Sequence, residues 1–442
     1  MNERGADSEP TRILYVTSRF PSVTSTFVAN EMTAVQALDY EVYVATLWPV
    51  VNAAPDAPHR GHPVERPFLP RVESTSLTAP RTWALALRAA LVRPSVLATC
   101  LRLLPGHLRS PWLFGKLLAV IPKGLAAGAR ARELGIERIH AHFITTPTTV
   151  ALLAAEVAGV PFTATAHAFD ITSRHPKRVN GSVLLKCRRA EAIVTISEYN
   201  RADMLRRWPE LESERLEVIY NGIDTSAFAP RTGARPLESG GALRVLSVSS
   251  LNAKKGFEYL VRAVALLRGE ETEVLLDIYG DGPDRAMLTE LITTLGVEEH
   301  VRLHGTIDQD RVAALCREAD VFVLASVPLD SDDADGLPTV LIEALSAELP
   351  TVSTQVTGIP EIVVDGETGL CVPPRDPAAI ARALRWMREH PAEAREMGSA
   401  GRRLVLRQFD RQRAARRLDT LWRTGRPAIE RGDASLASKS LK

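Results

Sequence analysis

The sequence predicts an α/β fold of two domains, each built on a doubly wound parallel sheet. Short runs of β-branched residues alternate with helical stretches through most of the 442 residues, and two series of this kind follow one another. Several runs are apolar without strict alternation, as expected for strands buried on both faces of a parallel sheet. A stretch rich in Gly, Pro, Arg and Ser separates the two series and is typical of a linker.

The elements follow this division in order. The first series predicts a domain over 11–225, with strands at 13–18, 42–47, 138–143, 162–167, 192–197 and 216–220. A linker over 226–241 leads to a second domain over 242–410, with strands at 243–249, 273–280, 300–305, 320–326 and 350–354. Helical patterns fill the intervals, for example Phe257–Leu267, Pro283–Leu295 and Asp310–Ala319. A C-terminal helix and a frayed tail are expected over 411–442.

Composition excludes several classes of protein. Apolar residues make up 45% and charged residues 24%, which is typical of a globular chain. Lys and Arg number 54 against 53 Asp and Glu, so a dedicated nucleic-acid binder is not expected. Four widely spaced cysteines without a CxxC pair predict reduced thiols, neither a disulfide scaffold nor a zinc site.

No targeting or membrane-spanning segment is expected either. The N-terminus is polar and has no apolar region of the signal-peptide kind. The longest run without Asp, Glu, Lys or Arg is Ile139–Ala155, and its seventeen residues fall short of the roughly 20 that span a bilayer. A cytoplasmic location, including the inner face of the cell membrane, follows.

The segment 74–132 stands apart from the rest of the first domain. It contains no Asp or Glu but nine Lys or Arg, interleaved with apolar residues that include Trp83, Trp112 and Phe114. A basic amphipathic surface of this kind can lie on anionic lipid headgroups, which would make the protein a peripheral membrane protein. Ordinary packing helices with a solvated basic face explain the same pattern.

The strongest motif lies in the second domain and reads Asp335-Gly-Leu-Pro-Thr-Val-Leu-Ile-Glu343-Ala. Pro338 suits a first helical position, so Asp335 is expected just before a helix and Glu343 inside it, roughly 7–8 Å along the axis from Pro338. The backbone amides between the two acids, at Gly336, Leu337 and Thr339, would face an anion. Alternatively, Asp335 only caps the helix and Glu343 is a surface residue.

The motif and its surroundings resemble the retaining glycosyltransferases of family four, which adopt the GT-B fold. Asp335 and Glu343 match the two acids of that family, with Asp where many relatives have Glu. Downstream segments such as Gly358-Ile-Pro-Glu361 agree in order and spacing, and the resemblance extends over roughly 11–410. It implies transfer of a sugar from a nucleotide diphosphate donor with retained anomeric configuration, no cofactor and no obligatory metal.

The resemblance also implies roles for individual residues of the donor side. Glu343 would bind the ribose hydroxyls, Asp335 would hold hydroxyls of the transferred sugar, and Lys255 would neutralise the diphosphate, unless it is a solvated turn lysine. Many relatives have an arginine where this chain has Ser250, so phosphate binding would depend on Lys255, Lys254, helix-end amides or another arginine. Gly280 and Gly282 form a βα turn that could face the nucleotide or simply provide tight geometry.

The acceptor domain contributes a second set of residues. Thr163-Ala-Thr-Ala-His167-Ala-Phe-Asp170 ends a predicted strand, where ligands of open α/β sheets bind, and it resembles a family segment whose histidine lies near the reacting sugar. His167 is therefore a candidate catalytic-site residue and Asp170 an acceptor-side group; a histidine satisfied at a strand end is the alternative.

Two further features of the first domain have a structural and a functional explanation. Ser25 and Thr26 lie before an expected helix, where they can cap it or contact the acceptor. His140 and His142 share one face of a strand and could pair on a metal, but no third ligand lies nearby in sequence, so no metal site is expected.

The function predicted from the sequence is that of a retaining glycosyltransferase. It would use a UDP-sugar, with a GDP-sugar next, and act on a saccharide or polyprenyl-linked acceptor in exopolysaccharide or cell-surface glycan synthesis. A soluble natural-product acceptor is an alternative. A sugar-nucleotide epimerase and a non-catalytic partner subunit on the same scaffold are the rival functions, and Ser250 is the feature that favours the partner subunit.

Overall fold

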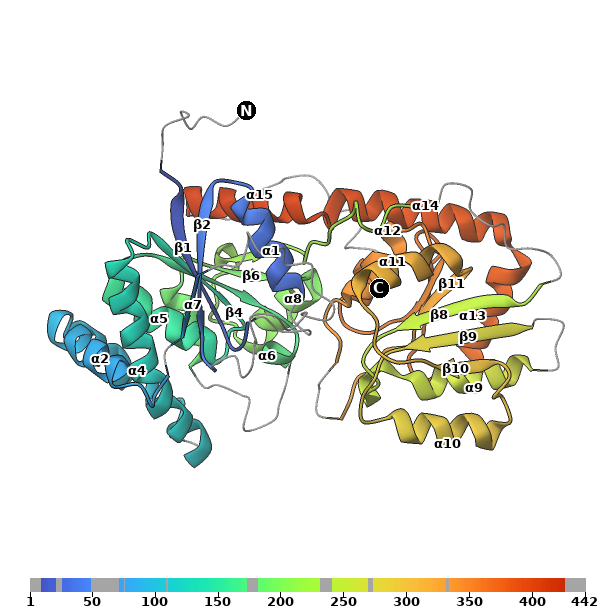
Figure 1. Cartoon of the computed structure of the whole chain (residues 1–442), viewed down its shortest axis with the longest axis horizontal. Coiled ribbons are helices and arrows are strands. Elements are labelled where there is room, and N and C mark those ends of the chain that lie inside the picture. Colours follow the sequence, from blue (N-terminus) through green and yellow to red (C-terminus); the bar gives the residue numbers. More distant parts are fainter. Residues whose placement is uncertain are drawn as a thin grey trace.

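The computed structural model describes residues 9–20, 26–48, 71–74, 76–108, 110–172, 182–230, 241–268, 273–330 and 334–425. Within these residues the strands form two sheets in which every neighbouring pair is parallel. Figure 1 shows the sheets side by side, with helices on both faces of each. The predicted fold class of two doubly wound α/β sheets is confirmed.

The first sheet has seven strands in the order β3-β2-β1-β4-β5-β6-β7. They are β1 (Thr11–Thr17), β2 (Tyr40–Thr46), β3 (Arg71–Ser74), β4 (Arg138–His142), β5 (Phe162–Ala166), β6 (Ala192–Thr195) and β7 (Leu216–Val218). All but β3 lie within two residues of the predicted starts. Strand β3, four residues at the edge of the sheet, was not predicted.

The second sheet repeats this topology with six strands in the order β10-β9-β8-β11-β12-β13. They are β8 (Leu243–Val248), β9 (Val274–Tyr279), β10 (Val301–Leu303), β11 (Val321–Leu324), β12 (Thr351–Thr354) and β13 (Leu370–Val372). In both sheets the strand order reverses at one point, between β1 and β4 and between β8 and β11. Ligands of such sheets bind at the carboxyl ends of the strands near this reversal.

The helices cover both faces of each sheet and bury separate apolar cores there. Those of the first series are α1 (Thr26–Gln36), α2 (Pro80–Val92), α3 (Ser95–Leu103), α4 (Pro111–Glu133), α5 (Thr146–Ala158), α6 (Phe169–Thr172), α7 (Val183–Arg189) and α8 (Glu198–Arg207). Those of the second are α9 (Phe257–Leu267), α10 (Arg285–Leu295), α11 (Gln309–Glu318), α12 (Thr339–Ser346), α13 (Pro377–Glu389), α14 (Pro391–Gln408) and α15 (Arg411–Thr424).

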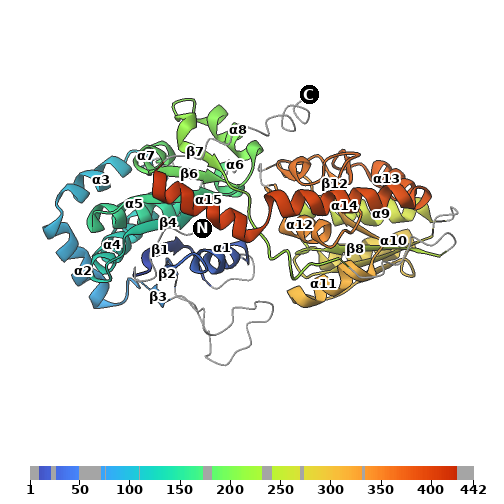
Figure 2. The same ribbon diagram turned by 90° about the horizontal axis from the view of Figure 1, so that it is seen from above.

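The last helix returns to the first sheet. Figure 2 shows α14 over the second sheet and α15 continuing from it across the first. Helix α15 packs against α1, and its Trp422 is buried and donates its indole N–H to Thr163 Oγ1 of β5 at 3.0 Å. Helix α15 therefore connects the part of the chain that covers the second sheet to the first sheet.

The basic segment 74–132 forms α2, α3 and α4 at one end of the molecule (Figure 1). Ala86, Val96, Leu103 and Leu117 of these helices belong to the buried core of the first sheet. By length and composition α4 could cross a membrane, as could α2 and α3 if that pair, bent by 111°, were one span. However, 61% of the apolar window of α4 is buried inside the molecule.

The expectation that the basic side chains of this segment are solvated is wrong for Lys123. Lys123 is 5% exposed, donates to the carbonyl of Leu47 and lies 4.9 Å from the ring centroid of Trp48. Its ammonium group therefore holds α4 to the end of β2 and contributes nothing to the surface charge.

All four cysteines, which are buried and free, agree with the expectation of reduced thiols.

Candidate functional site

The acid that precedes α12 is held in a buried ion pair. Lys255, at the end of the short turn before α9, donates to both carboxylate oxygens of Asp335 at 2.8 Å. Ser326, two residues beyond β11, donates its hydroxyl to Asp335 Oδ2 at 2.7 Å, and Lys254 Nζ lies 3.8 Å from Oδ1. Burial alone would raise the pKa of Asp335, but the two ammonium groups hold it below its usual value. Asp335 is therefore a fixed carboxylate.

The start of α12 differs from the prediction by one residue. Pro338 has φ −64° and ψ 113°, so it is the extended N-cap, and the first helical residue is Thr339. The preceding turn is held by Thr357, whose hydroxyl donates to the carbonyls of Asp335 and Gly336, and by the amide of Gly358, 3.1 Å from the Gly336 carbonyl. Leu337 is buried in the core beside the sheet, which anchors the turn.

Glu343 is the fifth residue of α12 and is partly buried. Burial raises the pKa of its carboxyl group to about 7, although a hydrogen bond with the Gln309 side chain acts in the opposite direction. The pKa values of the two acids of the motif are therefore shifted in opposite directions. Two ammonium groups lower the pKa of Asp335, whereas burial raises that of Glu343.

The loop that carries Asp335 touches the first sheet at the end of β5. A Cβ added to Gly336 would lie 2.4 Å from Cβ of Ala168, the residue after His167. Only glycine fits such an approach, so Gly336 lets the two sheets meet at this point. The contact brings the Asp335 loop beside the segment that contains His167, two features that the sequence placed at the same site.

His167 is 5% exposed and is held by three kinds of contact. Its Nε2 lies 3.2 Å from Nδ1 of His142, its ring packs against Phe27 and Phe143 at centroid distances of 4.7 and 4.6 Å, and its carbonyl accepts from Asn200 at 2.7 Å. Burial lowers the pKa of His167 well below its usual range, so the imidazole is neutral. A neutral ring can donate one hydrogen bond and accept another.

Asp170 supports the backbone of this segment. Its Oδ1 accepts from the amide of His167 at 2.9 Å, and its Oδ2 accepts from the amide of Ile144 at 2.7 Å. Burial raises the pKa of Asp170 to about 6. Since both oxygens are directed at backbone amides, Asp170 positions His167, and its predicted acceptor-side contact stays a prediction.

The phosphate side of the predicted site is made of closely packed turns. Ser250 Oγ accepts from Asn252 Nδ2 at 2.8 Å. A Cβ on Gly280 or Gly282 would meet the carbonyl oxygens of Ser249 and Leu251 at 1.9 and 2.2 Å, so these glycines are explained by the close approach of two loops. Arg285 is an arginine near this turn that sequence reasoning missed.

The Arg285 guanidinium donates to the carbonyl of His304 at 2.7 Å and, at longer range, to those of Gly280 and Leu303. Its two terminal nitrogens thus donate to backbone carbonyls. Arg285 also lines an open depression with Asp281, Gly282 and Pro283.

The two sheets are joined by a further contact that the sequence did not indicate. The carboxylate of Glu361, after β12, accepts from the amides of Glu198 and Tyr199 at 2.9 and 2.8 Å and from the hydroxyl of Tyr220 at 2.9 Å. An acid of the second sheet thus caps the N-terminus of α8 in the first, where a negative charge is favourable. From the sequence, the Gly-Ile-Pro-Glu segment indicates the family resemblance but not this contact.

The serine and threonine before α1 are placed unequally. Thr26 is the first residue of α1 and is partly buried, whereas Ser25 lies outside the described residues.

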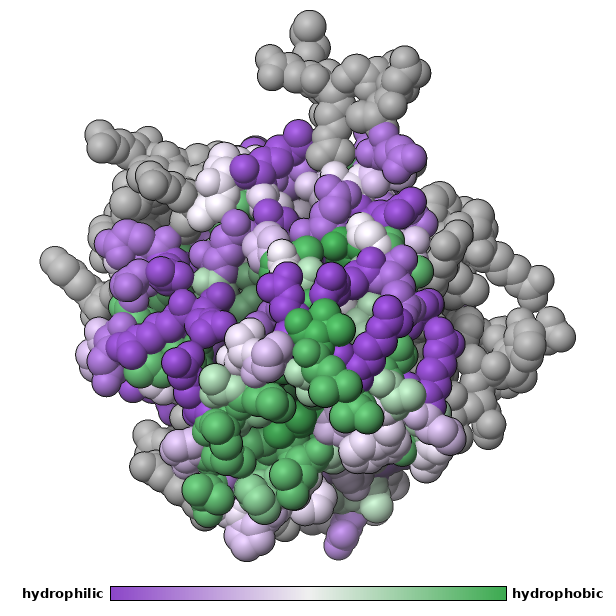
Figure 3. All heavy atoms as spheres, turned by 90° about the vertical axis from the view of Figure 1, so that its left-hand side faces the viewer, coloured by the Kyte–Doolittle hydropathy of each residue, from purple (hydrophilic) through white to green (hydrophobic). Residues whose placement is uncertain are grey.

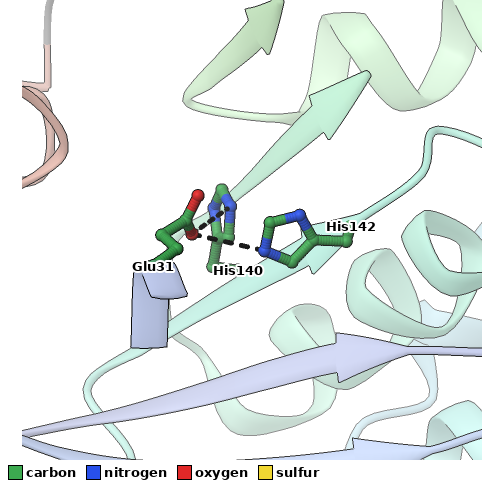
Figure 4. Close-up of side chains that lie close together, drawn as sticks. All are labelled: Glu31, His140 and His142. Carbon is green, nitrogen blue, oxygen red and sulfur yellow. Dashed lines mark ion pairs between the residues drawn. The ribbon is translucent and has the colours of Figure 1, made fainter. Parts of the chain in front are cut away.

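One feature corrects the expectation about metal ligands. His140 and His142 do lack a third ligand nearby in sequence, but the fold brings Glu31 of α1 to them, and the ligand atoms of the three lie within 4.8 Å of one another. Figure 4 shows the three side chains pointing toward one another. They could hold a metal ion.

Comparison with known proteins places this chain in a family. A model described as "Glycosyltransferase Family 4" matches residues 24–227, and one described as "Glycosyl transferases group 1" matches residues 234–404. A GDP-mannose-dependent alpha-(1-6)-phosphatidylinositol monomannoside mannosyltransferase of Mycolicibacterium smegmatis is 32% identical over 266 residues, which are 57% of this chain and 69% of that protein. The chain belongs to glycosyltransferase family 4.

Two further comparisons concern a relative that matches about half of the chain and a solved structure that matches the fold of nearly all of it. The putative colanic acid biosynthesis glycosyltransferase WcaL of Salmonella typhimurium is 31% identical over 212 residues, 48% of this chain; the chain thus spans about half, 52%, of the length of that relative. The crystal structure of Anabaena Alr3699/HepE in complex with UDP aligns with a TM-score of 0.69 and 17% identity, covering 94% of this chain and 100% of that one. The fold is GT-B.

Proposed function

We propose that this family 4 member transfers a sugar from a nucleotide diphosphate sugar, a UDP-sugar first of all, to a saccharide or polyprenyl-linked acceptor, with retention of the anomeric configuration. The contact of Gly336 with Ala168 carries the proposal, because it brings the loop of Asp335 next to the segment of His167. This contact supports one site, at the junction of the two sheets, for the candidate donor-binding helix and the candidate catalytic-site residue His167.

The ion pair of Asp335 suits it to a donor sugar. Lys255 and Ser326 fix the carboxylate, which then needs no reorganisation to accept hydrogen bonds from sugar hydroxyls. Lys255 has three N–H donors, and its two bonds to Asp335 leave one for a phosphate oxygen. One lysine can thus contact both the carboxylate that holds the donor sugar and the diphosphate of the donor. This contact compensates in part for the missing phosphate-binding arginine at position 250, where this chain has Ser250.

The reaction consists of one bond made and one bond broken at the anomeric carbon. The oxygen of the acceptor hydroxyl attacks the face from which the nucleoside diphosphate departs, and the bond to the diphosphate oxygen breaks with its electron pair. The proton of the acceptor passes to the leaving phosphate. Lys255 and the amides before α12 stabilise the charge that develops there, and no metal takes part in this step.

A role in the synthesis of an exopolysaccharide or cell-surface glycan is supported by the relatives. WcaL is named for colanic acid biosynthesis, and the Alr3699/HepE structure contains UDP. In the proposed polyprenyl-linked acceptor the growing saccharide is attached to a lipid. A cytoplasmic enzyme must therefore work at the inner face of the membrane to reach this acceptor.

The end of the molecule formed by α2, α3 and α4 offers a surface for this membrane contact. Figure 3 shows an apolar patch on this end of the molecule. The exposed large apolar side chains of these helices and the turns between them are Trp83, Leu87, Leu91, Val92, Leu97, Leu101, Leu108, Trp112 and Leu118. Exposed arginines at 81, 88, 93 and 102 lie among them. Large apolar patches of this kind mark interaction sites, and the arginines select an anionic lipid surface. The inner faces pack as ordinary core helices, so the proposed lipid contact concerns the outer faces alone.

Incubating the protein with separate UDP-, GDP- and dTDP-sugars and following slow hydrolysis tests the proposal. We expect one nucleotide sugar, a UDP-sugar, to be cleaved to the free sugar and the nucleoside diphosphate. Conversion of the sugar to an epimer without an acceptor would instead identify an epimerase. Failure to bind or cleave any member of the panel would favour the non-catalytic partner subunit.

A further inference from the structure

Two histidines of β4 and one glutamate of α1 form a buried cluster inside the first domain (Figure 4). His140 and His142 are two residues apart on a strand, so their rings lie on the same face of the sheet, and both side chains are completely buried. Glu31 approaches from the helix that covers this face. Its Oε1 lies 3.5 Å from His140 Nε2 and 3.3 Å from His142 Nε2.

The spacing of these atoms fits a shared ion better than direct hydrogen bonds. His142 Nε2 is buried and has no hydrogen-bond partner of adequate geometry in the described part of the chain. A buried polar atom left in this way costs about 1–3 kcal/mol unless something else satisfies it. Ligand atoms around a tetrahedral zinc ion, each roughly 2.0–2.1 Å from the metal, are separated by roughly 3.3 Å, close to the two separations found here.

The other ring nitrogens have the partners that metal-binding histidines usually have. His140 Nδ1 lies 2.8 Å from Thr163 Oγ1, and His142 Nδ1 lies 3.2 Å from His167 Nε2. Such outer partners fix the orientation of the ring so that the remaining nitrogen points at the ion.

The glutamate and the second nitrogen of His140 are also engaged. Tyr15 donates its hydroxyl to Glu31 Oε1 at 3.1 Å, which leaves that oxygen a second lone pair. His140 Nε2 lies 3.0 Å from the hydroxyl of Thr165. That oxygen lies on the lone-pair side of the nitrogen, so binding of an ion there requires the Thr165 side chain to turn about its Cα–Cβ bond.

We propose that Glu31, His140 and His142 bind one divalent transition-metal ion of the zinc type. Two imidazoles and one carboxylate suit such an ion, and a fourth position remains for a water molecule or another ligand. The ion ties α1 to β4. A metal on Nε2 of His142 also requires the ring proton to be on Nδ1, where it is donated to Nε2 of His167. The ion therefore positions His167 without taking part in the transfer of the sugar.

Metal titration of the full chain tests this proposal independently of any activity. The protein is stripped with a chelator, titrated with Zn²⁺ against a coloured competitor, and analysed for bound zinc after desalting. We expect one zinc ion per chain, together with a higher Tm in its presence. Co²⁺ should give the visible absorption of a four-coordinate site.

Two variants assign the site, and a third is the matched control. Glu31→Gln keeps an oxygen for Tyr15 but removes the anionic ligand, and His142→Gln removes a nitrogen ligand. Each substitution should weaken zinc binding by about 100-fold or more. Loss of a residue that only hydrogen-bonds to a metal ligand typically weakens metal binding by roughly tenfold to 100-fold. His304→Gln, in the second sheet and paired with Asp277, should leave binding unchanged.

The wild-type titration remains decisive even if a variant fails to fold. Substoichiometric zinc in the wild-type protein, without a change in Tm, would overturn the proposal. Wild-type affinity in folded Glu31→Gln and His142→Gln proteins would do the same, because the zinc would then bind elsewhere on the surface.

Discussion

The raised pKa of Glu343 predicts that this residue destabilises the protein at alkaline pH. In an unfolded chain the carboxyl group titrates near 4.5, whereas burial in α12 raises its pKa to about 7. The folded state therefore prefers the protonated form. Its penalty is absent below the unfolded pKa, grows as the pH rises from 4.5 to 7, and is complete above the folded pKa.

The size of the effect follows from these two values. A difference of about 2.5 pKa units, at about 1.4 kcal/mol per unit, gives about 3 kcal/mol at pH 8 and less than about 1 kcal/mol at pH 5. The figure for pH 8 is a ceiling because Glu343 is partly exposed and water screens its charge. Glu343→Gln keeps the shape and abolishes the titration, so the variant should be more stable than the wild type at pH 8.

Thermal unfolding at several pH values measures this difference. For a unit of 150–250 residues each kcal/mol shifts Tm by roughly 2–4 °C. We expect the variant to gain several degrees over the wild type at pH 8 and to match it near pH 4. Glu389→Gln, at the exposed end of α13, should follow the wild type throughout. A constant difference in Tm between Glu343→Gln and wild type across this range would refute the reasoning.

Three other predictions follow from the site and the surface. Lys255→Ala leaves the buried Asp335 without its main partner and should lower the stability by about 3–5 kcal/mol, measured as a lower Tm. Lys254→Ala should lower it by less than about 1 kcal/mol, and equal effects of the two variants would contradict the pairing of Asp335 with Lys255. Ribose hydroxyls favour the ionised form of Glu343, so the UDP affinity of the wild type, measured by calorimetry, should rise by up to about tenfold from pH 6 to pH 8, beyond any rise seen in Glu343→Gln. Parallel pH profiles of the two proteins would exclude this contact. Trp83→Ala/Trp112→Ala should reduce flotation of the protein with anionic liposomes, and equal flotation would dismiss these tryptophans as anchors.

Much of the fold could be predicted because its signals are local. Strands buried on both faces read as apolar runs, and α9 begins and ends at its predicted residues, since Gly256 precedes it with φ +63° and its apolar stripe is regular. Strands β3 and β13 escaped because β3 reads Arg-Val-Glu-Ser, with a single apolar residue, and β13 is a run of three residues bounded directly by Gly369 and Pro373. The position of α15 escaped because its packing on α1 depends on the chain crossing back over the first sheet.

The site was predictable in composition but not in its pairings. The motif spacing indicated Asp335 and Glu343, yet the partner of Asp335 lies eighty residues away, so the buried ion pair with Lys255 has no sequence signal. The same holds for Glu31, which meets His140 and His142 only because α1 covers β4. Glu361 could have been suspected from its segment, but its role as a cap on α8 depends on how the two sheets meet.

Calorimetric titration with UDP of the wild type, Glu343→Ala and the control Glu389→Ala tests the central claim that α12 holds the nucleotide of the donor. Loss of hydrogen bonds to a charged group costs about 1.5–3 kcal/mol, so Glu343→Ala should bind UDP at least about tenfold more weakly, with its fold intact and the control unchanged. UDP affinity in Glu343→Ala equal to that of the wild type would contradict the account.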